Sequence, residues 1–135
     1  MTFIKRYAIT FVLFLVLDSV WLGVISPRFY KAHIGWLLAD PPLWGAALLF
    51  YLVFIAGLVF FAVSPGLCDA SRGRAAARGG FFGLVTYATF DLTNQAVIAG
   101  WPWIVTIVDL VWGSFICAAT TLVSVLVCRR LRGEL

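Results

Sequence analysis

The sequence has little charge for its length. Of its 135 residues, 12% are Asp, Glu, Lys or Arg, whereas soluble domains carry about 25%. Because 63% of the residues are hydrophobic, a soluble protein of this composition would expose large apolar patches and aggregate. The shortage of charge therefore excludes an ordinary soluble globule. It favours a protein that uses the lipid bilayer as its solvent.

The sequence also lacks the short motifs that mark common catalytic, nucleotide and metal sites. It contains no glycine-rich phosphate loop, serine elbow, zinc-ligand spacing or CxxC pair. Cys68, Cys117 and Cys128 are expected to be unpaired thiols, and His33 is the single histidine. Carboxylate and amide oxygens would suit magnesium or calcium, but the residues favour neither, so we expect no metal ion and no cofactor.

Apolar residues are abundant and fall into four long runs. The runs cover residues 7–26, 43–63, 79–100 and 103–128, and each reaches the roughly 20 residues that a helix needs to cross a bilayer. Helices are expected because lipid offers no hydrogen-bond partners to free backbone groups. We therefore predict an all-α membrane protein, a four-transmembrane-helix bundle, with residues 1–135 forming a single transmembrane domain.

Basic residues are absent from these four runs and cluster between them. Eight of the ten basic residues lie before the first run, between the second and third runs, or after the fourth run. They are Lys5, Arg6, Arg72, Arg74, Arg78, Arg129, Arg130 and Arg132. The other side holds only Arg28 and Lys31. Since basic loops stay in the cytoplasm, we predict a bacterial inner-membrane protein with both termini cytoplasmic. This distribution reflects topology, so no nucleic-acid partner is expected.

The segment 27–42, between the first two runs, is predicted to form a short interfacial helix ended by Pro41 and Pro42. Its buried face would consist of Phe29, Tyr30, Ile34, Trp36, Leu37 and Leu38. Five tryptophans are expected near the same outer interface: Trp21, Trp36, Trp44, Trp101 and Trp103. This placement is typical of an aromatic belt, and the alternative is that it holds an amphipathic ligand.

Three carboxylates interrupt the apolar runs. By helical rise, Asp18, Asp91 and Asp109 lie about 12, about 13 and about 9 Å from the outer ends of their runs. A charged side chain at such depth costs about 3 kcal/mol or more, and no basic residue lies in the runs to neutralise it. Three acids from three helices are therefore predicted to meet in one layer.

Each aspartate has polar or aromatic neighbours at helical spacing, and together they predict a polar pocket open to the outer side. The candidate site residues for ligand or proton binding are Asp18, Asp91, Asp109, Tyr87, Asn94, Trp112, Trp21 and Thr106. At least one aspartate is expected to be protonated and to donate to Asn94, Tyr87 or a second carboxylate, because burial and nearby like charge disfavour ionisation. The alternative is that the aspartates only join helices by hydrogen bonds.

Gly79 and Gly83 have the small-xxx-small spacing that lets two membrane helices approach closely. Contact between helices of one chain is the favoured interpretation, and a homodimer interface is the alternative.

These residues, taken together, resemble the bacterial domain-of-unknown-function 2177 family of small predicted membrane proteins. The matching strings are residues 18–23 (DSVWLG), 28–30 (RFY), 50–52 (FYL) and 86–94 (TYATFDLTN), with Gly57, Trp101, Thr106, Asp109, Trp112 and Gly113. The family usually has a tyrosine before the third-run aspartate, where this chain has Phe90. The resemblance implies four spans and an inner-membrane location, and it implies no activity.

Three functions are weighed on this basis. The first is binding or carrying a small or amphipathic molecule. Such a carrier could be coupled to protons through the aspartates. Because four helices are few for a transporter, a carrier would act as a homodimer. The second is a membrane enzyme or accessory factor in lipid or fatty-acid modification, in which paired carboxylates serve as acid and base. The third is a structural or assembly protein. Membrane lipids are the expected partners in each case.

Overall fold

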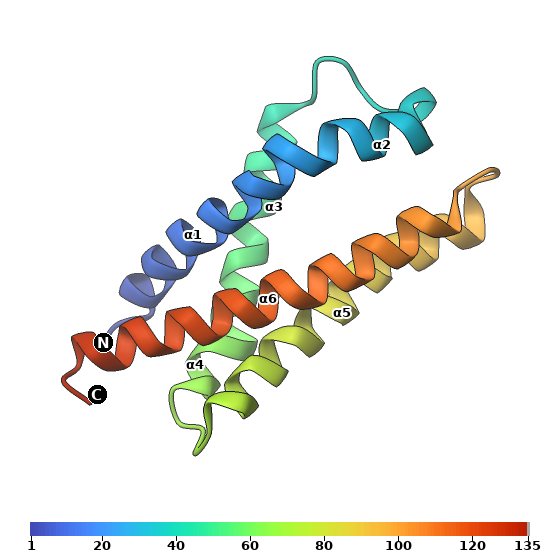
Figure 1. The fold of residues 1–135 in the computed structure, drawn as a ribbon. Helices are drawn as coiled ribbons and strands as arrows, with labels where there is room; N and C mark the ends of the chain where they lie inside the picture. The colour runs from blue at the N-terminus through green and yellow to red at the C-terminus, as the bar shows by residue number, and fades with distance from the viewer. Residues whose placement is uncertain (135) are drawn as a thin grey trace.

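The structure, a computed structural model, describes residues 1–134. This part of the chain is helical throughout, with turns and without strands, which confirms the predicted all-α class (Figure 1). The elements are α1 (Phe3–Val20), a π-helical turn (Trp21–Ile25), α2 (Ser26–Ile34), a 3-10 turn (Gly35–Leu37), α3 (Trp44–Leu58), a second π-helical turn (Val59–Val63), α4 (Ser64–Gly66), α5 (Arg72–Val97) and α6 (Trp103–Leu131).

Three helical stretches in residues 1–134 are long and apolar enough to cross a membrane. They are Phe3–Leu37, Trp44–Gly66 and Trp103–Leu131, and they correspond to the first, second and fourth predicted spans. The third predicted span lies on α5, which is 26 residues long but carries Asp91, Asn94 and Gln95 near its end. The structure therefore contains three candidate membrane spans, and the fourth span, on α5, stays a prediction.

The first helical stretch is longer than the predicted first span. α1 continues through the π-helical turn into α2, and the path bends there (Figure 1), as is common at π-helical insertions. α2 is thus an extension of α1 and not the separate loop helix that the sequence suggested. Of its predicted buried face, Ile34 is buried, Phe29 and Tyr30 are half-buried, and the three residues 36–38 are exposed.

The helices pack with both termini at the same end of the molecule. Figure 1 shows the turn between α4 and α5 at that end too, while α2 and the turn between α5 and α6 lie at the opposite end. α5 and α6 form an antiparallel pair in contact along most of their length, and α1 packs against α6. The three basic segments of the chain are therefore gathered at one end.

Glycines set the close approach of α5 and α6. A Cβ atom added at Gly79 would lie 2.6 Å from Thr121 Cβ, and one added at Gly83 would lie 2.8 Å from Cys117 Cβ. Both distances are too short for real carbon atoms, so side chains at these positions would force the helices apart. In the structure the small-xxx-small pair thus forms a contact within one chain.

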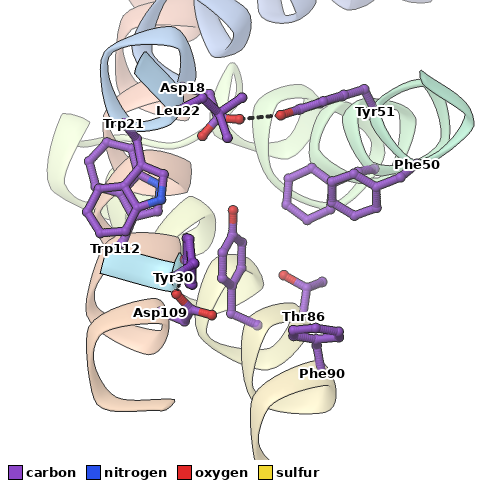
Figure 2. Close-up of a pocket in the computed structure, with 12 residues that line it drawn as sticks. Asp18, Trp21, Leu22, Tyr30, Phe50, Tyr51, Thr86, Phe90, Asp109 and Trp112 are labelled. Atoms are coloured by element: carbon purple, nitrogen blue, oxygen red, sulfur yellow. Dashed lines mark hydrogen bonds between the residues drawn. The ribbon is translucent and has the colours of Figure 1, made fainter. Parts of the chain in front are cut away.

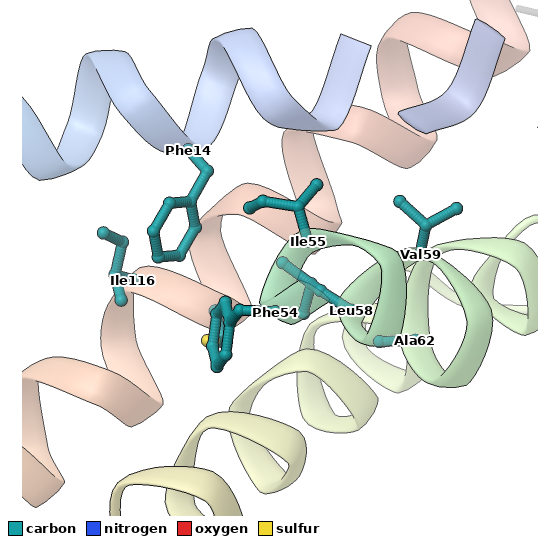
Figure 3. Packing of buried hydrophobic residues seen from close by; sticks show 8 residues of the cluster. Phe14, Phe54, Ile55, Leu58, Val59, Ala62 and Ile116 are labelled. Carbon is teal, nitrogen blue, oxygen red and sulfur yellow. The ribbon is translucent and has the colours of Figure 1, made fainter. Parts of the chain in front are cut away.

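A hydrophobic cluster fills the space where α1, α3 and α6 meet (Figure 3). Its buried members are Phe14, Phe54, Ile55, Leu58, Val59, Ala62, Ile116 and Cys117. Phe54 also lines the cavity described below. The cluster therefore closes that cavity on the side toward the basic end.

At the basic end, arginines bind the turn between α4 and α5. The Arg129 Nη2 atom donates to the carbonyl oxygens of Gly66, Leu67 and Asp69 at 3.3, 3.2 and 2.8 Å. Arg78 forms a two-bond ion pair with Asp69 at 2.7 and 3.1 Å, and this lowers the pKa of Asp69. A lowered pKa in the folded state means that this contribution is present at neutral pH and is lost only as acid protonates Asp69.

We expect Arg129→Met to lower the free energy of unfolding by about 2 kcal/mol, because carbonyl oxygens at the end of a helix lose a charged donor. Thermal unfolding of the purified protein in detergent measures this. Arg130→Met is the matched control, since Arg130 is exposed and the same charge is removed from the same helix end. Equal losses in both variants would contradict a specific role for Arg129.

Candidate functional site

A cavity of about 360 Å³ lies between α1, α2, α3, α5 and α6 (Figure 2). It is lined by Asp18, Trp21, Leu22, Tyr30, Phe50, Tyr51, Phe54, Thr86, Tyr87, Phe90, Asp109 and Trp112. Eight of these twelve side chains are aromatic, two are carboxylates, and none is basic. The volume is within the range of small-molecule sites, about 300–1,000 Å³.

Two carboxylates in the lining each accept a hydrogen bond from a tyrosine on another helix. The Tyr51 hydroxyl on α3 donates to Asp18 Oδ2 on α1 at 2.5 Å. The Tyr30 hydroxyl on α2 donates to Asp109 Oδ1 on α6. Both aspartates are buried, with exposed fractions of 6% and 5%. Each carboxylate is thereby held in place and keeps a second oxygen that these tyrosines do not use.

Aromatic rings form the walls between the two carboxylates. The indoles of Trp21 and Trp112 are stacked, with ring centroids 4.5 Å apart and planes inclined by 11°. Figure 2 shows this pair on one side of the cavity and Phe50 on the opposite side. The indole N–H of Trp112 is buried and has no hydrogen-bond partner among the described residues. One donor of the lining is therefore unsatisfied.

Asp91 lies behind the cavity, next to Asp109. Its side chain is fully buried, and neither carboxyl oxygen has a hydrogen-bond partner within residues 1–134. The Asp91 and Asp109 carboxyl groups are close enough to interact. An ionised carboxylate without donors is costly in an apolar interior, so the surroundings of Asp91 favour its neutral form.

Thr106 and Asn94 do not line the cavity. The Thr106 hydroxyl accepts from the Trp101 indole at 3.1 Å and donates to Gln95 Oε1 at 2.9 Å, while the Gln95 amide donates to the Trp101 carbonyl at 2.9 Å. This network fastens the turn between α5 and α6. Asn94 is half-buried on α5.

Five of the eight predicted site residues line one cavity: Asp18, Trp21, Tyr87, Asp109 and Trp112. Asp91 is the neighbour of Asp109, and the other two predicted residues lie outside. The sequence predicted that a protonated aspartate donates to Asn94, Tyr87 or a second carboxylate. In the structure, Asp18 and Asp109 instead accept hydrogen bonds from the hydroxyls of Tyr51 and Tyr30.

The sequence interpretation assigned no site role to Tyr30 and Tyr51. The position of Tyr51 could have been predicted, because by helical rise it lies about 12 Å into its run, at the depth of the aspartates. The position of Tyr30 could not be predicted in this way, because the sequence placed it on the apolar face of a separate interfacial helix. Its approach to Asp109 depends on the continuation of α1 into α2.

An apolar groove of about 640 Å³ between α3 and α5 lies next to the cavity. Phe50, Phe54 and Thr86 line both spaces. The groove residues come from Ala46–Gly57 of α3, from Phe61 in the π-helical turn that follows it, and from Phe82–Thr89 of α5. α3 and α5 make few contacts with each other. The site thus consists of a cavity lined by two carboxyl groups and an apolar groove beside it.

Within residues 1–134, no three His, Cys, Asp or Glu side chains are grouped so that they could hold a metal ion.

A family model described as "Predicted membrane protein (DUF2177)" matches residues 3–126. No curated protein and no solved structure matches the chain.

Proposed function

The chain belongs to the DUF2177 family of predicted membrane proteins, and from this premise we propose that it crosses a bacterial inner membrane four times, has both termini in the cytoplasm, and binds or carries an amphipathic molecule. The observation that supports this most is that the carboxylate-bearing cavity and the apolar groove of α3 and α5 lie side by side and share Phe50, Phe54 and Thr86 in their walls.

The surface of α5 supports its assignment as the remaining span. Near its outer end, Asp91 is buried and Asn94 and Gln95 are half-buried, so the most polar side chains are turned from the surface, while Thr89 and Thr93 are exposed. The exposed side of the same helix carries Phe81, Leu84, Val85, Phe90, Leu92 and Val97. An apolar outer face with an interior polar face is the arrangement that lipid favours. The low average hydropathy of α5 then reflects the site that it lines.

The topology predicts which side of the membrane exposes Cys68. Cys68 is the one exposed cysteine of the three and lies beside the turn between α4 and α5, whereas Cys117 and Cys128 are buried. We expect a membrane-impermeant maleimide to label Cys68 in inside-out vesicles and not in intact spheroplasts. Ala39→Cys in a Cys68→Ser background is the control, because residue 39 is exposed at the opposite end. Labelling of Cys68 from outside would reverse the proposed orientation.

Binding of an amphipath is supported by the match between its two ends and the two parts of the site. The polar end would lie among the aromatic rings and carboxylates, and the apolar chain would lie along the groove, where Leu49, Val53 and Phe61 are open to the surrounding lipid. An amphipath could enter sideways from the bilayer along this path, so it would not have to cross the aqueous phase.

Native mass spectrometry of protein released from lipid nanodiscs tests this proposal. We expect the wild-type protein to retain one amphipathic molecule and Thr86→Phe to lose it, because Thr86 lies where cavity and groove join. Leu84→Phe, on the exposed face of α5, is the matched control and should retain the molecule. Equal retention by the wild type and Thr86→Phe would contradict the proposed site.

A second candidate function, an enzyme or accessory factor in lipid modification, is favoured by the same sideways opening together with the neighbouring acids Asp91 and Asp109. Paired carboxyl groups can act as general acid and base, and the groove would bring a lipid chain to them. Comparison of membrane lipids from cells with and without the gene tests this function. Identical lipid profiles under varied growth conditions would count against it.

A further inference from the structure

We propose that the head group recognised in the cavity is an organic cation, an aliphatic or quaternary ammonium. This inference rests on the proposed function and adds the chemical class of the ligand. It is carried by the combination of aromatic faces, two separately held carboxylates and the absence of basic side chains from the described lining.

The aromatic lining favours a soft cation over other head groups. The faces of tryptophan, tyrosine and phenylalanine rings carry negative potential and attract ammonium groups, with tryptophan the strongest. Two tryptophans and three tyrosines line the cavity along with Phe50, Phe54 and Phe90. Sets of aromatic rings around one space are the usual means by which proteins bind quaternary ammonium ions.

Two carboxyl groups in the lining can serve as counter-ions to a bound cation. Asp18 and Asp109 approach the space from α1 and α6, and each is anchored by one tyrosine hydroxyl (Figure 2). An anionic head group would meet these carboxylates with no Lys, Arg or His in the lining to offset the repulsion. A neutral head group would offer Asp18 and Asp109 no opposite charge to pair with.

The groove adds a requirement for an apolar chain on the cation. A small inorganic ion would fill neither the cavity nor the groove. An alkylammonium would place its nitrogen among the rings near Asp18 and Asp109, and its chain would pass Phe50, Phe54 and Thr86 into the groove. The shape of the site therefore selects a cation with a chain attached.

The test compares three probes with the same tail and different head groups: hexyltrimethylammonium, hexan-1-ol and hexyl sulfate. Binding to the purified full chain in nanodiscs is measured by isothermal titration calorimetry, with empty nanodiscs subtracted. We expect the ammonium to bind at least about tenfold more tightly than the alcohol, because ring faces and carboxylates both favour the charge, and the sulfate to bind more weakly still.

Asp18→Asn and Asp109→Asn should reduce affinity for the ammonium by at least about tenfold and leave affinity for the alcohol unchanged. Asp69→Asn, an aspartate at the far basic end, is the matched control and should bind like the wild type. The head-group comparison on the wild-type protein decides the proposal even where an Asn variant does not fold.

The outcomes separate this inference from the proposed function. Tighter binding of the ammonium supports both. Equal binding of all three probes, or tighter binding of the sulfate, overturns the cationic head group and leaves amphipath binding intact. Failure of the three probes to bind, together with equal retention by the wild type and Thr86→Phe in native mass spectrometry, overturns both.

Discussion

Gly113→Ala is expected to lower the free energy of unfolding by about 3 kcal/mol, at the upper end of the range for an extra carbon forced into a packed interior. A Cβ atom at position 113 would lie 2.6 Å from Tyr87 Cδ2 and overlap the neighbouring ring carbons. Because the ring is in contact close to its point of attachment, it cannot rotate away without moving α5. Thermal unfolding of the purified protein in detergent measures the loss.

The double variant Gly113→Ala with Tyr87→Ala isolates this contact. Tyr87→Ala alone should also be costly, because its half-buried ring packs against the hydrophobic cluster and removing a large aromatic ring from a core costs about 3–5 kcal/mol. Once the ring is gone, the added methyl group has room, so the double variant should be no less stable than Tyr87→Ala. Gly80→Ala is the control on α5, because a Cβ there would make an ordinary 3.5 Å contact with Ala118 Cβ. Additive losses in the double variant would contradict the proposed collision.

Under the proposed carrier function with proton coupling, Asp91→Asn is expected to abolish the pH dependence of uptake while leaving the protein folded. Asp91 is fully buried without a hydrogen-bond donor, whereas Asp18 and Asp109 each accept from a tyrosine. The neutral form of Asp91 is therefore the one that its surroundings favour, and asparagine has nearly the same size and no charge. If Asp91 releases its proton when a cation binds beside Asp109, movement of the cation across the membrane is coupled to movement of the proton.

Uptake of radiolabelled hexyltrimethylammonium into liposomes with an imposed pH gradient measures this effect. Wild-type uptake should follow the gradient, and uptake by Asp91→Asn should be the same with and without it. Asp69→Asn, which changes an aspartate outside the site, should behave like the wild type. Gradient-dependent uptake by Asp91→Asn at the wild-type level would remove proton coupling through this residue.

The cavity residues on α1, α5 and α6 could be predicted from the sequence because depth and helical spacing locate a side chain on a long helix. Asp18 and Asp109 were identified by depth, and Trp112 and Tyr87 by their spacing from an aspartate. The same depth argument extends to Tyr51, whose hydroxyl reaches Asp18. Regular helical geometry accounts for all five positions.

The remaining features depend on geometry that a periodic pattern does not contain. Tyr30 meets Asp109, 79 positions away, because the π-helical turn at Trp21–Ile25 carries α1 onward into α2 where a separate interfacial helix was expected. Thr106 lies at a suitable depth for the cavity, but its hydroxyl is taken by Gln95 and Trp101. Insertions in a helix and competition between neighbouring polar groups become visible only in three dimensions.

The parallel indoles of Trp21 and Trp112 have a consequence for spectroscopy. Two identical chromophores with ring centroids 4.5 Å apart couple electronically, and where their in-plane transition moments are rotated against each other the pair contributes an exciton couplet to the far-ultraviolet circular dichroism spectrum. The couplet would disappear in Trp112→Leu. Since both rings line the cavity, a guest that spreads or tilts them would change the signal. The protein therefore carries an intrinsic optical reporter at its own site.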